Sequence, residues 1–229
     1  MTIYVVATPI GNLNDMTFRA VEILKKVNYI LAEDTRVTRK LLNHFEIETK
    51  LVSFHEYSDE KKYEKIFDLL KEGSELALVC DAGTPAISDP GYFLIQQIKQ
   101  NLPEVKVVPI PGPSAITTLV SVSGVNAKEF TFLGFPPHKK GRKTFFENLI
   151  IESKKRPVVF YESKHRIVKA LESLKENIEQ NPGLERKITI GRELTKTFEE
   201  IVSGSAGEML DFFVNNPEKI KGEFVIIIS

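Results

Sequence analysis

Short apolar runs alternate with amphipathic segments along the chain, and this alternation limits the folds that are available. In the first half the apolar runs are IYVVA, YILAE, LVSF, ELALVC and VKVVPI. Helical periodicity lies between and after them, over residues 16–27, 35–45, 59–72, 91–101 and 114–122, with Asp15 and Ser114 as expected N-caps of the first and last helix. Strands that alternate with helices pair in parallel, so the first half predicts a largely parallel sheet covered by helices.

The pattern restarts near GVNAKEF, residues 124–130. Beyond it we expect strands at FTFLGF, PVVFYE, RKITIGREL and EFVIII, and helices over residues 141–153, 164–177 and 206–216. A length of 229 residues suits two domains of ordinary size. The sequence therefore predicts an α/β protein with two α/β domains, residues 1–122 and 123–229, the second with a mixed sheet.

The single cysteine, Cys80, excludes an intramolecular disulfide and ends an apolar run, so we expect a buried strand residue rather than a nucleophile. One cysteine in 229 residues fits a reducing cytoplasm. No apolar stretch has transmembrane length, and no basic segment precedes the first apolar run. We therefore expect a cytoplasmic protein without a signal peptide.

The charges are unevenly distributed, although 31 basic side chains balance 31 acidic ones. Residues 136–169 carry ten basic and three acidic side chains. A solvated surface explains such a block, and so does contact with a polyanion, because phosphate attraction depends on the local field. Charge alone favours the solvated surface.

Three loops rich in glycine and proline follow predicted strands: ATPIGNLND, CDAGTPAISDPG and PIPGPSA. In an open α/β sheet, ligands bind outside the carboxyl ends of the strands, where such loops meet. Neither the dinucleotide nor the P-loop fingerprint is present in the sequence. A cationic cofactor such as a sulfonium needs no phosphate cradle, and Asp81 or Asp89 could face its charge. Alternatively, these residues only stabilise turns, with Asp89 capping the next helix.

Three charged clusters follow other predicted strands. AEDTRVTRK places Glu33 and Asp34 before Arg36, Arg39 and Lys40, which share one face of a helix. FYESKHRI and GRELTKTFEE place further acids and bases beyond strand ends. These clusters could bind RNA or orient a hydroxyl group, or form surface salt bridges. The four histidines lack metal-ligand spacing, so we expect no metal site.

Together these segments resemble a known family. VVATPIGNLNDMTFRA, AEDTRVTRKLL, DAGTPAISDPGY, PIPGPSAI, FYESKHRI, GRELTKTFEE and KGEFV resemble, in order, the motifs of the ribosomal RNA small subunit methyltransferase I family. That family belongs to the tetrapyrrole methylase-like superfamily of class III, S-adenosylmethionine-dependent methyltransferases. The resemblance runs from Ile3 to the C-terminus.

The resemblance implies two α/β domains with the cofactor, S-adenosylmethionine, in the interdomain cleft, and usually a homodimer. It also implies methylation of the ribose 2′-hydroxyl of a decoding-centre cytidine in 16S ribosomal RNA. The substrate is either naked RNA or RNA assembled in the small subunit. The implied cofactor contacts are Pro9, Ile10, Asp81, Gly83, Thr84, Ile87, Ser88, Ser114, Ala115, Tyr161, Glu162, Glu193, Leu194 and Glu223. The basic residues give candidate RNA contacts, which are Arg39, Lys139, Lys140, Arg142, Lys143, Lys164 and Arg166.

Transfer to a neutral hydroxyl calls for a base and for a cation near the developing oxyanion. Base candidates are Glu33, Asp34, Asp89 and Glu193, and cation candidates are Arg36, Lys40 and Lys196. Two other functions stay open: the same fold acting on a tetrapyrrole or a protein side chain, and a cofactor- or RNA-binding module without turnover. Tetrapyrrole-methylating relatives carry a first loop of the form G-x-G-P-G-[DS], whereas this chain has TPIGNL, which argues against a porphyrin substrate.

Overall fold

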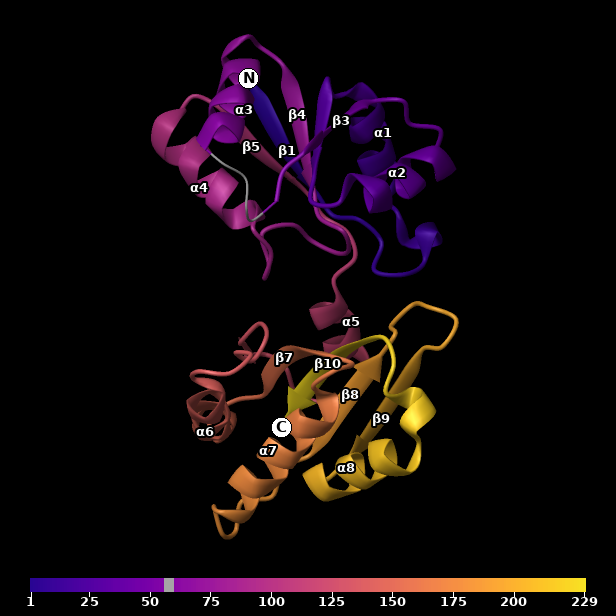
Figure 1. Ribbon diagram of the computed structural model, residues 1–229, viewed down its shortest axis with the longest axis vertical. Coiled ribbons are helices and arrows are strands. Elements are labelled where there is room, and N and C mark those ends of the chain that lie inside the picture. The colour runs from indigo at the N-terminus through magenta and orange to yellow at the C-terminus, as the bar shows by residue number, and fades with distance from the viewer. Residues whose placement is uncertain (56–59) are drawn as a thin grey trace. The chain divides into compact units, whose positions relative to one another are not determined.

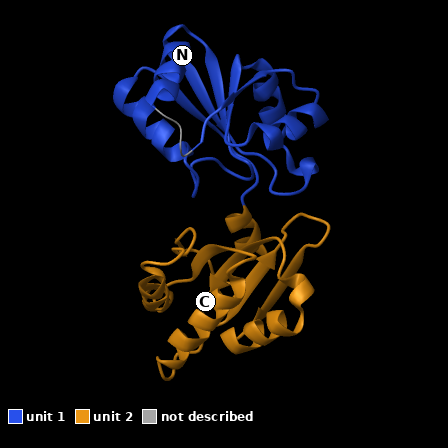
Figure 2. Ribbon diagram, viewed as in Figure 1, with its two compact units in different colours: residues 1–114 blue, residues 115–229 orange. Residues whose placement is uncertain are grey.

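The computed structural model describes residues 1–55 and 60–229. The chain forms two compact units, Met1–Ser114 and Ala115–Ser229 (Figure 2). Both are α/β structures, as the alternation predicts. Among the described residues, no helix has the length and apolar character that crossing a membrane requires.

The first unit is a five-stranded parallel sheet with helices on both faces (Figure 1). The strand order is β3-β2-β4-β1-β5. The strands are β1 (Thr2–Val6), β2 (Tyr29–Ala32), β3 (Lys50–Ser53), β4 (Glu75–Val79) and β5 (Lys106–Ile110). The helices are α1 (Phe18–Lys26), α2 (Thr35–His44), α3 (Glu60–Lys71) and α4 (Gly91–Asn101), with the short 3-10 helix η1 (Leu13–Asp15) after β1.

Each face of this sheet has its own core. Helices α3 and α4 bury Ile66, Leu70 and Ile98 against one face. Helices α1 and α2 bury Leu24 and Leu42 against the other. Burying one such side chain contributes about 1.5–3 kcal/mol. This division sends the connections that leave β1 and β4 over opposite faces of the sheet, although the two strands are neighbours.

The second unit contains a mixed sheet of order β6-β7-β10-β8-β9, in which β6 and β7 are parallel and the other pairs are antiparallel. The strands are β6 (Thr131–Phe132), β7 (Val158–Ser163), β8 (Ile188–Arg192), β9 (Glu200–Gly204) and β10 (Glu223–Ile228). The helices are α5 (Ala115–Val122), α6 (Arg142–Ser153), α7 (Ile167–Glu179) and α8 (Ala206–Asn215), with the 3-10 helix η2 (Pro217–Lys219). Phenylalanine rings of α6, α8 and the strands fill its core.

Several details differ from the sequence predictions, and three of them change a boundary, a cap or the presence of an element. The division falls after Ser114 rather than after residue 122, because α5 packs in the second unit, where Leu119 approaches Gly191 of β8. Thr17, not Asp15, caps α1, and its hydroxyl accepts a hydrogen bond from the Ala20 N–H. Strand β9 was not predicted at all. The start predicted for the third helix, residue 59, lies outside the described residues.

Candidate functional site

The three glycine- and proline-rich loops meet at the carboxyl edge of the parallel sheet, because β4, β1 and β5 are adjacent. The loops after β1 and β4 exchange two main-chain hydrogen bonds, Thr8 N–H to Gly83 O (2.9 Å) and Gly83 N–H to Thr8 O (3.0 Å). The Thr84 hydroxyl donates to the carbonyl of Pro113, which joins the loop after β4 to the loop after β5. The convergence expected from the sequence is therefore present.

Two glycines allow this close approach. Gly83 has φ +83°, a left-handed conformation that side chains disfavour, and a Cβ there would lie 3.4 Å from Ile10 Cγ2. A Cβ on Gly112 would lie 3.0 Å from the Cβ of Ala7. Ala86 and Ser88, which are not glycines, also have positive φ and flank the exposed Ile87. Such strain is characteristic of binding loops.

Neighbouring strands β1 and β4 form the switch point of the sheet, because their connections leave over opposite faces (Figure 1). Ligands of open α/β sheets bind at this position. Pro9 and Ile10 are buried beneath the loops, and Gly83 is also buried. Asp81, Ile87 and Ser88 are exposed above them. The buried residues shape the loops, and the exposed ones are available to a ligand.

Of the two aspartates in the loop after β4, Asp81 is exposed at the strand end, where its Oδ1 accepts a hydrogen bond from the Asp34 N–H at 3.0 Å. Asp89 instead binds the Gly91 N–H, at the first residue of α4, at 2.7 Å. Partial burial raises the pKa of both carboxyls above the ordinary value. An exposed carboxylate at the switch point of the sheet can face the positive charge of a sulfonium, so the residues at this edge fit S-adenosylmethionine.

Cys80 is buried, as predicted, but it lies just beyond β4 rather than within the strand, and its thiol contacts the carbonyl oxygens of Ala82 and Gly83. Burial raises the pKa of the thiol to about 12. A thiol protonated at neutral pH is a poor nucleophile. The buried Thr8, which the sequence analysis did not single out, donates its hydroxyl to the Cys80 carbonyl at 3.2 Å.

The acidic and basic residues after β2 lie beside β4, the neighbouring strand. Asp34 caps α2 by accepting the Arg36 N–H, and the Arg36 guanidinium binds both of its carboxylate oxygens. Hydrogen bonds from Arg36 hold the pKa of Asp34 well below its usual range, which makes Asp34 a weak base. Glu33 is partly buried at the end of β2, while Arg39 and Lys40 are exposed on α2.

The predicted second-unit residues gather at one edge of the mixed sheet. Glu223 pairs with Ser163, and Phe224 lies opposite both Glu162 and Arg192. Tyr161, Glu162, Glu193, Leu194 and Glu223 are therefore brought together. The Lys196 amine bridges Glu193 and Glu223, at 2.8 Å from each carboxylate. These contacts raise the pKa of Lys196 despite the opposing effect of desolvation, so it is paired rather than isolated.

The loop after β8 is held in an unusual conformation, with φ +50° at Glu193 and +67° at Thr195. The Glu193 carboxylate lies against Gly222, where any side chain would collide with it. Glu193 Oε1 also accepts the Glu223 N–H at 2.9 Å. Gly222 was missed by the sequence analysis, although the KGEFV motif contains it.

Glu162 differs from the expected cofactor contact. Its side chain is fully buried and bound to Arg142 and Arg166, at 3.0 and 3.1 Å. Those two guanidinium groups are therefore engaged inside the unit rather than open to RNA. Lys139, Lys140, Lys143 and Lys164 are exposed, as RNA contacts would require. Tyr161 packs its ring on Phe132 and Phe135.

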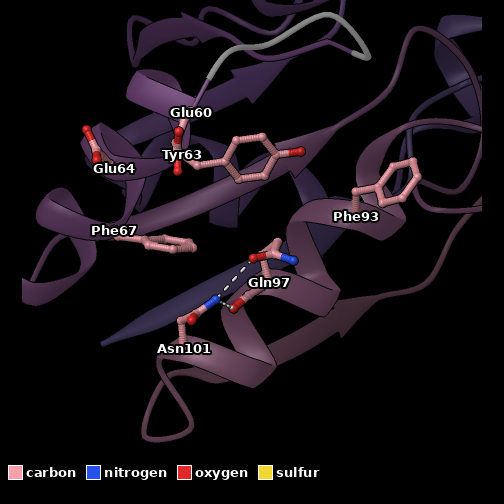
Figure 3. Close-up of a pocket in the computed structure, with 7 residues that line it drawn as sticks. All are labelled: Glu60, Tyr63, Glu64, Phe67, Phe93, Gln97 and Asn101. Atoms are coloured by element: carbon pink, nitrogen blue, oxygen red, sulfur yellow. Dashed lines mark hydrogen bonds between the residues drawn. The ribbon is translucent and has the colours of Figure 1, made fainter.

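A separate hollow of about 490 Å³ lies between α3 and α4 in the first unit (Figure 3). Aromatic rings of Tyr63, Phe67 and Phe93 line it, and the Asn101 amide donates to Gln97 at its rim. It contains none of the predicted site residues and lies on a helical face rather than at the carboxyl edge.

Residues 2–210 match the family model of tetrapyrrole (corrin/porphyrin) methylases. Among curated proteins, "Ribosomal RNA small subunit methyltransferase I" of Vibrio cholerae is 44% identical over 99% of this chain and 76% of its own length. The protein of that name from Halalkalibacterium halodurans is 45% identical over 100% of this chain and 75% of its own length. The protein of that name from Borrelia garinii subsp. bavariensis is 43% identical over 99% of this chain and 98% of its own length.

Solved structures share the fold at low sequence identity. A cobalt precorrin-4 methyltransferase superposes with a TM-score of 0.70 and 15% identity over 99% of this chain and 94% of its own. Uroporphyrin-III C-methyltransferase from Thermus thermophilus superposes with a TM-score of 0.65 and 14% identity, over 100% of this chain and 94% of its own. These two comparisons establish the architecture.

Proposed function

This chain belongs to the tetrapyrrole methylase family of S-adenosylmethionine-dependent methyltransferases, and from that premise we propose that its substrate is the RNA of the small ribosomal subunit. The proposed product is 16S ribosomal RNA methylated on the ribose 2′-hydroxyl of a decoding-centre cytidine. Similarity over the whole chain to proteins named ribosomal RNA small subunit methyltransferase I is the observation that carries the proposal. The exposed lysines of residues 136–169 support it, because RNA is held mainly through its phosphates.

When bound, S-adenosylmethionine supplies a sulfonium methyl group, which passes to the ribose oxygen as a C–O bond forms and the C–S bond breaks. Asp81 is the proposed partner of the positive charge, with Gly83–Ser88 lining the cofactor through its backbone. Pro9, Ile10 and the main chain of Ser114 and Ala115 complete the proposed contacts of the three loops. In the second unit we retain Tyr161, Glu193, Leu194 and Glu223 as proposed contacts.

Glu33 is the proposed base for the ribose proton. Glu33 directly follows β2, next to the strand that leads to Asp81, whereas Arg36 holds the pKa of the neighbouring Asp34 well below its usual range and makes it a weak base. Lys40 and Arg36, one turn apart on α2, are the proposed cations for the developing oxyanion. Lys196 lies in the second unit, where it bridges Glu193 and Glu223, and its proposed role is to order the loop after β8.

Transfer of a labelled methyl group tests the proposal directly. Small subunits from a strain lacking this enzyme, and naked 16S RNA from the same strain, are incubated with the protein and labelled cofactor. We expect label in RNA, at a linkage that resists alkaline hydrolysis as a 2′-O-methylated ribose does. A folded, cofactor-bound protein that labels neither substrate would contradict the proposal and leave the binding-module function.

A tetrapyrrole substrate is the second candidate, since the two solved structures with the same fold carry that activity in their names. The loop TPIGNL argues against it. Titration with uroporphyrinogen or a precorrin, beside the RNA assay, separates the two. The proposed homodimer follows the family resemblance, and sedimentation tests it. The proposed cytoplasmic location rests on the single cysteine, and cell fractionation tests it.

A further inference from the structure

The loop between β6 and α6 carries part of the basic block and has a defined internal support. Its sequence, LGFPPHKKG, covers residues 133–141. His138, Lys139 and Lys140 are exposed at its end, whereas Pro136 is buried. Gly141, at φ +86°, turns the chain into α6. The two lysines therefore lie on a segment that is exposed at one end and buried at Pro136.

Two arginines from outside the loop hold that buried side. Arg166 Nη1 donates to the carbonyl of Pro136 at 3.0 Å, and Arg142 Nη1 donates to the carbonyl of Pro137 at 3.4 Å. Neither proline has an N–H group, so the carbonyls are the polar groups through which their backbone can be fixed. The Arg142 guanidinium also lies over the Phe146 ring, 5.1 Å from its centre.

Glu162 joins the two arginines. Its Oε2 accepts from Arg142 Nη2 at 3.0 Å, and its Oε1 lies 3.1 Å from Arg166 Nε and accepts the Ser163 N–H at 2.8 Å. The Glu162 side chain is 0% exposed and each arginine side chain 16%. A buried ion pair adds little stability beyond that of well-packed apolar residues, but its geometry can be highly specific.

We propose that Glu162 is a positioning residue for RNA binding. Through Arg142 and Arg166 it holds residues 136–140 in one conformation, so that Lys139 and Lys140 meet RNA phosphates without a further ordering cost. Fixing a loop before binding raises affinity by removing that cost. This inference rests on the proposed RNA substrate and replaces the cofactor contact that the resemblance implied for Glu162.

A double-mutant cycle tests the inference. Glu162→Gln is combined with Lys139→Ala/Lys140→Ala, and the dissociation constants for unmodified small subunits and for S-adenosylmethionine are measured. We expect Glu162→Gln alone to weaken subunit binding roughly tenfold, with cofactor affinity within about twofold. In the Lys139→Ala/Lys140→Ala background the same substitution should cause no further loss of subunit affinity, because it acts through those two lysines.

Glu200→Gln is the matched control. Glu200 is also a carboxylate between two cations, Arg192 and Lys219, at β9, which is the opposite edge of the same sheet from β6. We expect it to leave subunit affinity unchanged. Equal losses from both variants, additive losses in the cycle, or a parallel loss of cofactor affinity would each overturn the inference.

Arg166→Lys covers the case in which Glu162→Gln does not fold. A lysine keeps the charge near Glu162 but cannot also reach the Pro136 carbonyl with a second donor, so part of the subunit affinity should be lost. Unchanged subunit affinity for a folded Arg166→Lys would also overturn the inference. A wild-type protein that binds no small subunit would instead overturn the proposed function itself.

Discussion

The two units bring chemistry to a sheet edge in different ways. In the first unit the loops beyond β1, β4 and β5 are tied together mainly by main-chain groups, and the exposed carboxylate of Asp81 stands among them. In the second unit the strand-end loops are held by ion pairs, of which Glu162 with two arginines and Lys196 with two glutamates are the clearest.

The difference follows from topology. Parallel strands place successive carboxyl ends at one edge, so their loops can bond directly to each other. The antiparallel pairs of the second sheet bring the start of β10 beside the ends of β7 and β8, where charged side chains bridge the gaps. We infer that the first unit shapes a site with its backbone, and the second with charge.

Disrupting the main-chain pairing of the first-unit loops should have the largest effect on ligand affinity. Gly83→Val forces a β-branched residue into φ +83° and disrupts the paired bonds between Thr8 and Gly83. We expect cofactor affinity to fall about 100-fold or more, which corresponds to roughly 3 kcal/mol, by calorimetric titration. Gly73→Val is the control, since Gly73 has φ +90° but lies before β4 in open space. Equal effects of the two variants would contradict the prediction.

Reversing the charge of exposed lysines in the second unit should have the next largest effect, on the affinity for the small subunit. Lys139, Lys140 and Lys143 replaced by glutamate should weaken small-subunit binding about 100-fold at low salt and reduce its salt dependence. Arg142 is excluded, because reversing it would break the contact with Glu162. The control reverses three exposed lysines of the first unit, Lys71, Lys99 and Lys106, for the same net charge. Equal losses would indicate a response to total charge, and cofactor affinity should not change in either.

Removing the charge of Asp81 should separate ligand binding from stability. Burial raises the pKa of this carboxyl in the folded protein. The stability that the protonated form contributes is therefore lost as the pH rises from the unfolded-state pKa through the folded-state pKa, and this loss persists at neutral pH. We expect Asp81→Asn to lower cofactor affinity roughly tenfold, with a Tm at pH 7 no lower than that of the wild type.

For the wild type, cofactor affinity should fall as acid protonates Asp81. A lower Tm with unchanged affinity would assign Asp81 a structural role.

Features of the two units that depend on local sequence pattern could be predicted from the sequence. Helix α4 begins and ends where periodicity placed it, at Gly91 and Asn101, and the three loops meet as their strands implied. Strand β9 was missed because it is an edge strand in which Ile201 faces solvent, and the charged GRELTKTFEE segment leads into it. Edge strands with alternating exposure give only a weak apolar signal.

Partners distant in the sequence could not be predicted. Glu162 looked like a strand-end acid beside a basic trio, and nothing in FYESKHRI shows that Arg142, twenty residues earlier, enters the same buried pair. Similarly, Lys196 appeared to be an available cation until the structure placed Glu223 beside it. Composition records the charges, but only the fold decides which of them neutralise one another.

Asp89 provides the smallest and most discriminating test. It lies in the same loop as Asp81, but its carboxylate accepts the Gly91 N–H at the start of α4. Asp89→Ala should therefore cost about 1 kcal/mol of the free energy of unfolding, the usual value for one lost intramolecular hydrogen bond, and leave cofactor affinity within about twofold. Asp89→Asn keeps an acceptor oxygen and should restore most of that stability. If Asp89→Ala lowered cofactor affinity as much as Asp81→Asn does, both acids would belong to the ligand site. The loop would then bind through paired carboxylates, and the distinction between a backbone-shaped first unit and a charge-ordered second unit would fail.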